Sequence, residues 1–166
     1  MIQKILIAVD GSAPAARAAQ AGFDLAKQVR ARVALLHVVD VGPAVTPDLV
    51  IVQEQAIREL KDAGRALLQQ FHARFPHTPA AERLLVEGEA AETILCTARA
   101  WGADLVVLGS DSRGRLANFL LGGTADAVIR RAECPVLTVR LQPEKPARAA
   151  AAATAASQQV VARTPA

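Results

Sequence analysis

The chain has 166 residues, of which 52% are hydrophobic and 21% are charged. That length suits one domain with its own core and excludes two large domains, and the composition is typical of a globular protein and not of a disordered one. Two cysteines in so long a chain cannot build a disulfide scaffold, so a reducing, cytoplasmic setting is expected.

The formal net charge of +3 is unevenly placed along the chain. Residues 141–166 hold three basic residues against one acidic residue, so the rest of the chain is close to neutral. The chain also lacks tyrosine and has one tryptophan and four phenylalanines, too few for base-stacking platforms. No apolar run approaches the ~18 residues of a membrane span. We therefore expect neither nucleic acid nor a membrane as a partner.

The first 30 residues predict a strand, a tight turn and a helix. Residues 5–9 (ILIAV) form a continuous apolar run, which indicates a strand buried on both faces. The turn formers Asp10, Gly11 and Ser12 follow, and Ser12 is placed to cap a helix. Small and apolar residues then recur at helical spacing as far as Val29.

The same alternation continues to residue 140. Further apolar runs predict four more strands, and amphipathic segments between them predict three more helices. The predicted strands are residues 33–39, 83–86, 105–108 and 135–140, and the predicted helices are one that ends near Phe75 and two over residues 89–101 and 124–132. Apolar strands that alternate with helices imply a parallel sheet covered on both faces. We predict a Rossmann-like, doubly wound α/β domain with five strands in the order 3-2-1-4-5.

This α/β domain is expected to cover residues 1–140. Residues 141–166 contain ten alanines together with Pro, Gln, Ser and Thr, and they show no periodicity of large apolar residues. Such a segment has nothing with which to bury a core, so we predict a mobile C-terminal tail.

In open α/β sheets, ligands bind beyond the carboxyl ends of the strands, where the strand order reverses. For the predicted order, the ends of strands one and four flank that crevice, and they carry Asp10 and residues 109–115 (GSDSRGR). Gly122 and Gly123 then open a helix at Thr124, where backbone N–H groups and the helix dipole favour an anion. These features predict a phosphate site, while the same residue types also mark ordinary turns. The Walker and GxGxxG patterns are absent.

Three stretches of the chain carry a recognisable resemblance: KILIAVDGS at the start, LLHVVD after the first helix, and residues 104–140 (DLVVLGSDSRGRLANFLLGGTADAVIRRAECPVLTVR). They resemble the universal stress protein family over residues 1 to about 140. The ATP-binding members of that family carry G-x-x-G, nine residues and then G-S/T. Here the run begins at Gly109 and keeps the nine-residue spacer, but it departs from the pattern at Ser112 and Gly123.

The resemblance implies an adenine nucleotide, ATP or AMP, as the cofactor, with Mg²⁺ as a candidate companion. In the family's binding members, the positions similar to Asp10 and Val38 contact the adenosine, Val38 through its backbone, and the position similar to Gly109 lies along the ribose. The positions similar to Ser112, Gly122 and Gly123 hold the phosphates.

The chemistry of the two departures is compatible with binding. Ser112 keeps a backbone N–H and adds a hydroxyl, but it adopts a positive φ only at a cost that glycine avoids. Thr124 can replace the hydroxyl lost at Gly123 only if the helix begins later. Arg113 is either a solvated loop charge or a clamp on the anion, and Asp10 has the plainer alternative of accepting hydrogen bonds within its own turn. We expect nucleotide binding to survive.

Two functions of different classes are open. The first is a small cytoplasmic stress-response protein that binds an adenine nucleotide as a switch or sensor. The second is a nucleotide-independent dimeric interaction module of the same fold. Both share a homodimer through the predicted edge strand Pro135 to Arg140, because an apolar unpaired edge tends to be covered by a partner. Nothing supplies both a positioned water and a charge clamp, so ATP hydrolysis is expected to be slow at most.

Other residues are expected to serve packing. Cys96 and Cys134 stand in no metal-binding spacing and are predicted to be buried thiols. His37 lies inside a predicted strand and is interpreted as a hydrogen-bonded histidine of the core or its rim. A Gly109→Val substitution is predicted to abolish nucleotide binding while leaving the fold intact.

Overall fold

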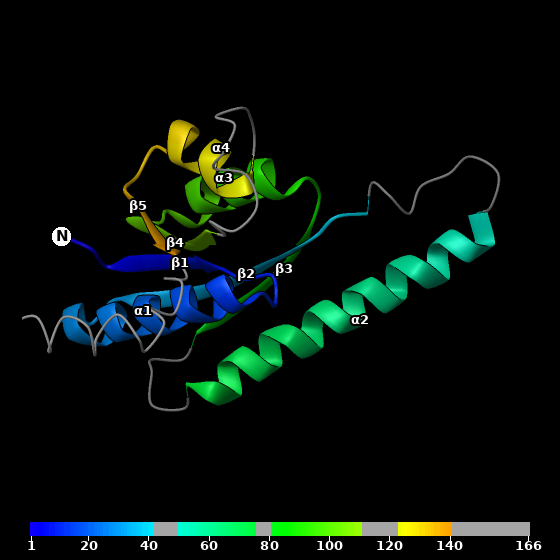
Figure 1. Cartoon of the computed structure of the whole chain (residues 1–166), viewed down its shortest axis with the longest axis horizontal. Helices are drawn as coiled ribbons and strands as arrows, with labels where there is room; N and C mark the ends of the chain where they lie inside the picture. The colour runs from blue at the N-terminus through cyan, green and yellow to red at the C-terminus, as the bar shows by residue number, and fades with distance from the viewer. Residues whose placement is uncertain (42–49, 76–80, 111–122, 141–166) are drawn as a thin grey trace, which may run out of the picture.

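The computed structural model describes residues 1–41, 50–75, 81–110 and 123–140. Five strands form one parallel sheet in the order β3-β2-β1-β4-β5, which confirms the predicted fold class. Figure 1 shows the strands stacked between two layers of helices. The strands are β1 (Lys4–Ala8), β2 (Arg32–Val39), β3 (Glu82–Glu87), β4 (Leu105–Ser110) and β5 (Val136–Arg140), and the helices are α1 (Ala13–Val29), α2 (Val50–Arg74), α3 (Ala90–Trp101) and α4 (Thr124–Arg131).

The strand ends differ from the predicted ends at the edge where the crevice was expected. β1 stops at Ala8, one residue early, whereas β4 continues through Gly109 and Ser110 instead of ending at residue 108. The extension is held by β5, since Gly109 pairs with Val139 and Ser110 with Arg140. Gly109 is therefore a strand residue, and its assignment to a loop was wrong.

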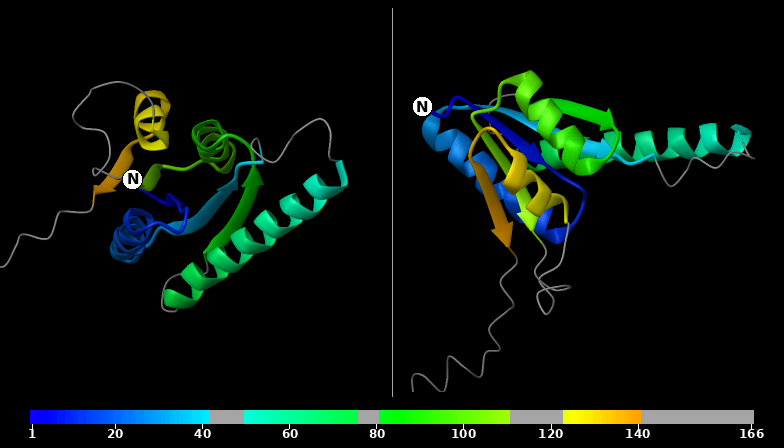
Figure 2. Two further views of the ribbon diagram at one scale, coloured as in Figure 1. Left: turned by 45° about the vertical axis from the view of Figure 1, so that its right-hand side comes forward. Right: turned by 90° about the horizontal axis from the view of Figure 1, so that it is seen from above.

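Each face of the sheet has its own apolar core, because successive side chains of a strand point to opposite faces. Along β1, Ile5 and Ile7 enter the core beneath α1 and α2, whereas Leu6 enters the core beneath α3 and α4. Figure 2 shows the same division of the helices about the sheet. No helix within the described residues is long and apolar enough to cross a bilayer.

Two helical glycines allow helices to lie close to the sheet. A Cβ on Gly22 of α1 would lie 2.7 Å from Cδ1 of Ile7, and a Cβ on Gly64 of α2 would lie 2.6 Å from Cδ1 of Leu85 and 2.7 Å from Cδ2 of His37. Real Cβ atoms do not approach other atoms so closely, so both helices depend on the missing side chain for their present positions.

The base of the sheet, opposite the strand tips, is tied together around Trp101. The Lys4 ammonium donates to the Trp101 carbonyl oxygen at 2.8 Å and lies 5.3 Å from the indole ring centroid. The indole N–H donates to Glu82 Oε2 at 3.0 Å, and this bond is the main cause that lowers the pKa of the Glu82 carboxyl. Arg32 also binds Glu82, at 2.6 Å. The starts of β1, β2 and β3 are thus linked to the end of α3.

The predicted burial of the two thiols was wrong for Cys96 and holds in part for Cys134. Cys96 is exposed, because it lies on the outward face of α3 while Ile94 and Leu95 face the core. Cys134 is half-buried just before β5, and burial raises the pKa of its thiol. Neither cysteine forms a disulfide.

The core beneath α1 and α2 should be sensitive to loss of an aromatic side chain. The Phe23 side chain is 1% exposed and stacks on Phe75 with ring centroids 4.4 Å apart. Phe23→Ala is therefore expected to lower the free energy of unfolding by about 3–5 kcal/mol, measured by urea titration with Trp101 fluorescence. Leu137→Ala, at a β5 position that is 36% exposed, is the control and should cost about 1 kcal/mol. Equal losses would contradict this description of the core.

Candidate functional site

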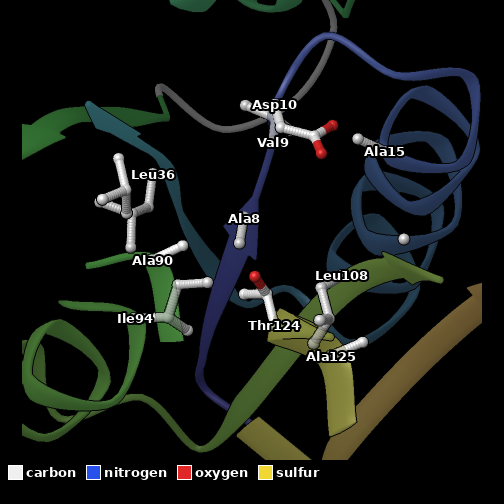
Figure 3. A pocket seen from close by; sticks show the side chains of 12 residues that line it. Ala8, Val9, Asp10, Ala15, Leu36, Ala90, Ile94, Leu108, Thr124 and Ala125 are labelled. Carbon is white, nitrogen blue, oxygen red and sulfur yellow. The ribbon is translucent and has the colours of Figure 1, made fainter. Parts of the chain in front are cut away.

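The main cavity near the strand tips lies at the carboxyl ends of β1, β2 and β4, where the strand order reverses. Its volume is about 110 Å³, below the ~300–1,000 Å³ of pockets that enclose a drug-sized ligand, so it can enclose a group the size of a flat ring, and the rest of a larger ligand would lie outside it. Figure 3 shows the side chains that line it. The lining residues are Ala8, Val9, Asp10, Ala15, Leu36, Val38, Ala90, Ile94, Leu108, Gly109, Thr124 and Ala125.

Asp10 belongs both to a turn and to the cavity wall. Its Oδ1 accepts a hydrogen bond from the Ser12 N–H at 3.0 Å, and Gly11 between them takes a φ of +80° that glycine adopts without strain. Ser12 then caps α1 by accepting from the Ala15 N–H at 3.3 Å. The structural duty in the turn is therefore present, and one carboxylate oxygen remains for another partner. In Figure 3 the carboxylate extends toward Ala15.

Val38 offers backbone groups to the cavity because β1 ends too early to pair with it. The last pair of the β1–β2 ladder is Ala8 with Leu36, and the next hydrogen bond runs from the Val9 N–H to the Leu36 carbonyl at 2.9 Å. Residues two apart along a strand direct their backbone groups to the same side. The N–H and C=O of Val38 therefore point to the side that β1 has left, where Val38 lines the cavity.

The helix N-termini around the cavity differ in how their first amides are satisfied. Ser12 caps α1, and Glu89 caps α3 by accepting from the N–H groups of Glu92 at 2.8 Å and Ala91 at 3.0 Å. The pKa of the Glu89 carboxyl is lowered mainly by the hydrogen bond from the Glu92 N–H and next by the one from the Ala91 N–H. The N-cap of α4 is Gly123, which has no side chain to cap with. Of these three helices, α4 alone has no side-chain cap.

Gly109 packs against the first turn of α1. A Cβ on Gly109 would lie 2.5 Å from both the Ala15 nitrogen and the Pro14 carbonyl carbon. These are backbone atoms, which cannot rotate away as a side-chain tip can. The prediction that Gly109→Val would leave the fold intact was therefore wrong.

Four of the eight sequence-predicted site residues line one cavity. Asp10, Val38, Gly109 and Thr124 contribute to it, and Gly123 directly precedes Thr124 as the N-cap of α4. The other three predicted residues, Ser112, Arg113 and Gly122, lie outside the described residues.

Sequence reasoning missed the apolar wall of the cavity. Ala90 and Ile94 reach it from the first turns of α3, and Ala125 reaches it from α4. The apolar periodicity of α3 was visible in the sequence. Such periodicity identifies a buried helix face, but it does not show that a cavity lies beside that face. Among the described residues, no cluster of three or more His, Cys, Asp or Glu side chains could hold a metal ion.

A second cavity, of about 270 Å³, lies between the C-terminal ends of α3 and α4 and is lined in part by Arg99, Glu133 and Cys134. Its charged groups are already paired, since Arg99 binds Glu133 at 2.7 Å and Arg131 binds Glu92 at 2.7 Å. It lies at the opposite end of α3 from the strand tips. Although this second cavity is larger than the one at the switch point, its charged side chains are already in ion pairs, so it has fewer free groups with which to bind a ligand.

Comparison with known proteins identifies the family. The model of the universal stress protein family matches residues 1–140. The chain belongs to the universal stress protein family. Universal stress protein YxiE of Bacillus subtilis is 34% identical over 148 residues, which cover 84% of this chain and all of the relative.

Solved structures of universal stress proteins share the fold. UspA of Lactobacillus plantarum has a TM-score of 0.72 at 26% identity, covering 84% of this chain and 98% of that one. A universal stress protein solved in complex with cAMP has a TM-score of 0.67 at 22% identity, covering 83% of this chain and 97% of that one. At that identity the second comparison shows the fold alone.

The two glycines of this universal stress protein's site should respond differently to a methyl group. Gly109→Ala is expected to lower the free energy of unfolding by about 1–3 kcal/mol, because the methyl group meets α1 backbone. Gly123→Ala is the matched control: a Cβ there meets nothing within 4 Å, and its φ of −77° suits any residue. It should change the free energy of unfolding by less than about 1 kcal/mol, because the loss of chain entropy favours Ala while the N-cap position favours Gly. Urea unfolding of both variants measures this, and a harmless Gly109→Ala would contradict the packing role.

Proposed function

We propose that this chain binds an adenine nucleotide, ATP or AMP, in the cavity at the tips of β1 and β4 and works as a nucleotide-dependent switch or sensor in the stress response. The observation that carries the proposal is the make-up of that cavity. An apolar recess, one carboxylate and an uncapped helix N-terminus stand side by side at the switch point of the sheet.

The apolar recess suits the base. Leu36, Ile94 and Leu108 give it a hydrophobic lining, and a purine ring gains by leaving water for such a surface. Polar recognition at its edge would come from the Val38 backbone, which offers one donor and one acceptor on the side that β1 has left. An adenine edge presents a ring-nitrogen acceptor and an amino donor, which match that pair.

The carboxylate suits the ribose. Asp10 is the only charged side chain of the described lining, and a carboxylate accepts hydrogen bonds from hydroxyl groups. The bond from the Ser12 N–H occupies Oδ1, so Oδ2 would accept from a ribose hydroxyl. Gly109 leaves the wall beside it free of a side chain.

The N-terminus of α4 suits the phosphates. Its first amides and the helix dipole attract an anion, and Gly123 and Thr124 begin the helix there. Asp126 in the same turn brings a negative charge, but its carboxylate binds Arg130 at 2.9 Å. Ser112, Arg113 and Gly122 would add further donors and a positive charge. A universal stress protein that shares the fold was solved in complex with cAMP, itself an adenine nucleotide.

Isothermal titration calorimetry with ATP and AMP in the presence of Mg²⁺ tests the proposal. We expect a Kd below 1 mM, a binding free energy more favourable than about −4 kcal/mol. Asp10→Asn should weaken binding at least about tenfold, since it removes a charged acceptor. Thr124→Val keeps the side chain's shape and should weaken binding by roughly two- to tenfold, the cost of one neutral hydrogen bond.

Asp24→Asn is the matched control, because it makes the same change of charge at an exposed position of α1 whose carboxylate, among the described residues, binds Gln20 alone. It should leave the affinity unchanged. The absence of binding to wild-type protein at millimolar nucleotide would contradict the proposal. A fall in affinity with Asp24→Asn equal to that with Asp10→Asn would instead show a non-specific charge effect.

A homodimer through β5 is the second part of the proposal, and the alternative function, a nucleotide-independent interaction module, rests on it alone. Within the described chain β5 pairs only with β4, which leaves its other edge open, and Leu137 on it is 36% exposed. Open apolar edges attract partner strands.

Light scattering of the full chain at high micromolar concentration should give the mass of a dimer. Thr138→Pro, which removes a donor from the outer strand, should shift it toward the monomer, and Thr138→Ser is the control. A wild-type monomer would exclude the dimer. If the purified dimer shows no nucleotide absorbance at 260 nm and binds no ATP, the interaction module is favoured over the switch.

The remaining expectations about function fit this proposal. The free, exposed thiol of Cys96 suits a reducing compartment such as the cytoplasm. Any hydrolysis of ATP would be slow, because Asp10 is the only ionisable side chain of the described lining and is engaged in its turn.

A further inference from the structure

We propose that His37 is a positioning residue of the nucleotide site: it holds the tip of β1 so that Asp10 faces the cavity. The inference rests on the proposed function and names a residue outside the cavity lining. Its basis is the hydrogen bond of 2.8 Å between His37 Nδ1 and the carbonyl oxygen of Val9, the residue directly before Asp10.

The direction of this hydrogen bond follows from its acceptor. A carbonyl oxygen only accepts, so Nδ1 must carry the proton and donate. The Val9 carbonyl lies beyond the last pair of the β1–β2 ladder, which ends at Ala8 opposite Leu36. No described backbone N–H donates to it. The imidazole thus replaces the ladder bond that Val38 would have made, and it leaves the Val38 N–H for the cavity.

Helix α2 packs against the imidazole ring that makes this hydrogen bond. A Cβ on Gly64 would lie 2.7 Å from His37 Cδ2 and 3.3 Å from Nε2, so only a glycine lets α2 come down onto the ring. A hydrogen bond that is shielded from water is stronger, and losing its donor there leaves a carbonyl without a partner. The ring is half-buried in this position.

The same helix also lies near the other side of Asp10. A Cβ on Gly11 would lie 3.5 Å from Leu67 Cδ1, so the Leu67 side chain of α2 is close to the turn. The residue before Asp10 is therefore anchored by the His37 hydrogen bond, and Leu67 lies near the residue after it. Between them, the Asp10 carboxylate and the Ser12 N–H close the turn at 3.0 Å. Loss of the His37 donor removes the anchor before Asp10.

Two substitutions separate positioning from packing. His37→Asn puts an amide N–H at the place of Nδ1, whereas His37→Leu fills similar space without a donor. We expect His37→Leu to weaken ATP binding roughly tenfold and His37→Asn to stay within about threefold of wild type. Leu68→Ala, which destabilises the same core from α2 at a site 3% exposed, should keep its affinity when measured well below its melting temperature.

The outcome that overturns the proposal is an equal affinity of the Asn and Leu variants, whether both are lost or both are kept. A loss with Leu68→Ala as large as that with His37→Leu would likewise reduce the effect to general destabilisation. Nitrogen NMR of the wild-type ring should show the proton on Nδ1, and a proton on Nε2 alone would also overturn it.

Amide hydrogen exchange keeps this test separate from the proposed function. If the wild-type protein binds no nucleotide, the proposed function fails, and the exchange rate of the Ser12 N–H decides the positioning role. That N–H is protected by Asp10, so it should exchange several times faster in His37→Leu than in His37→Asn. Equal rates in the two variants would show that His37 does not hold the turn.

Discussion

The early end of β1 is the constraint on which the rest of this site depends. β1 is the central strand and pairs with both β2 and β4, but its ladder with β2 stops at Ala8 while β2 continues to Val39 and β4 to Ser110. The sheet therefore has a notch at its centre. Backbone groups at the walls of the notch lose their strand partner, and the chain leaves β1 just where Asp10 can turn toward the gap.

Close packing, and not ligand contact alone, explains the small residues around this notch. Gly109 is needed because the first turn of α1 lies against it, and Gly64 because α2 lies against His37 and Leu85. Gly123, by contrast, has open space around its missing side chain. Three glycines that look alike in the sequence therefore have different physical roles, two set by neighbouring backbone or rings and one by the start of a helix.

The fold could be predicted because its signals are local. Apolar runs and the Ser12 cap mark the elements within a residue or two, and alternation of strands with helices then limits the topology. The exposure of Cys96 could not be predicted as readily, since it depends on which face of α3 meets the sheet. The packing of Gly109 on α1 could not be read at all, because the two segments are about a hundred residues apart and nothing local encodes their contact.

The helix caps make one side of the notch a better place for an anion than the other. The first amides of α3 are already bound by Glu89, and an amide of α1 is bound by Ser12. An anion could bind these amides only by displacing the capping side chain, which costs free energy. Of these three helix N-termini, only that of α4, whose N-cap is Gly123, has no side chain to displace. In the proposed function, the negative charge of the nucleotide would therefore be drawn toward β4 and α4, while Asp10 would repel it from the β1 side. A base bound beside β2 would then have its phosphates directed away from that strand.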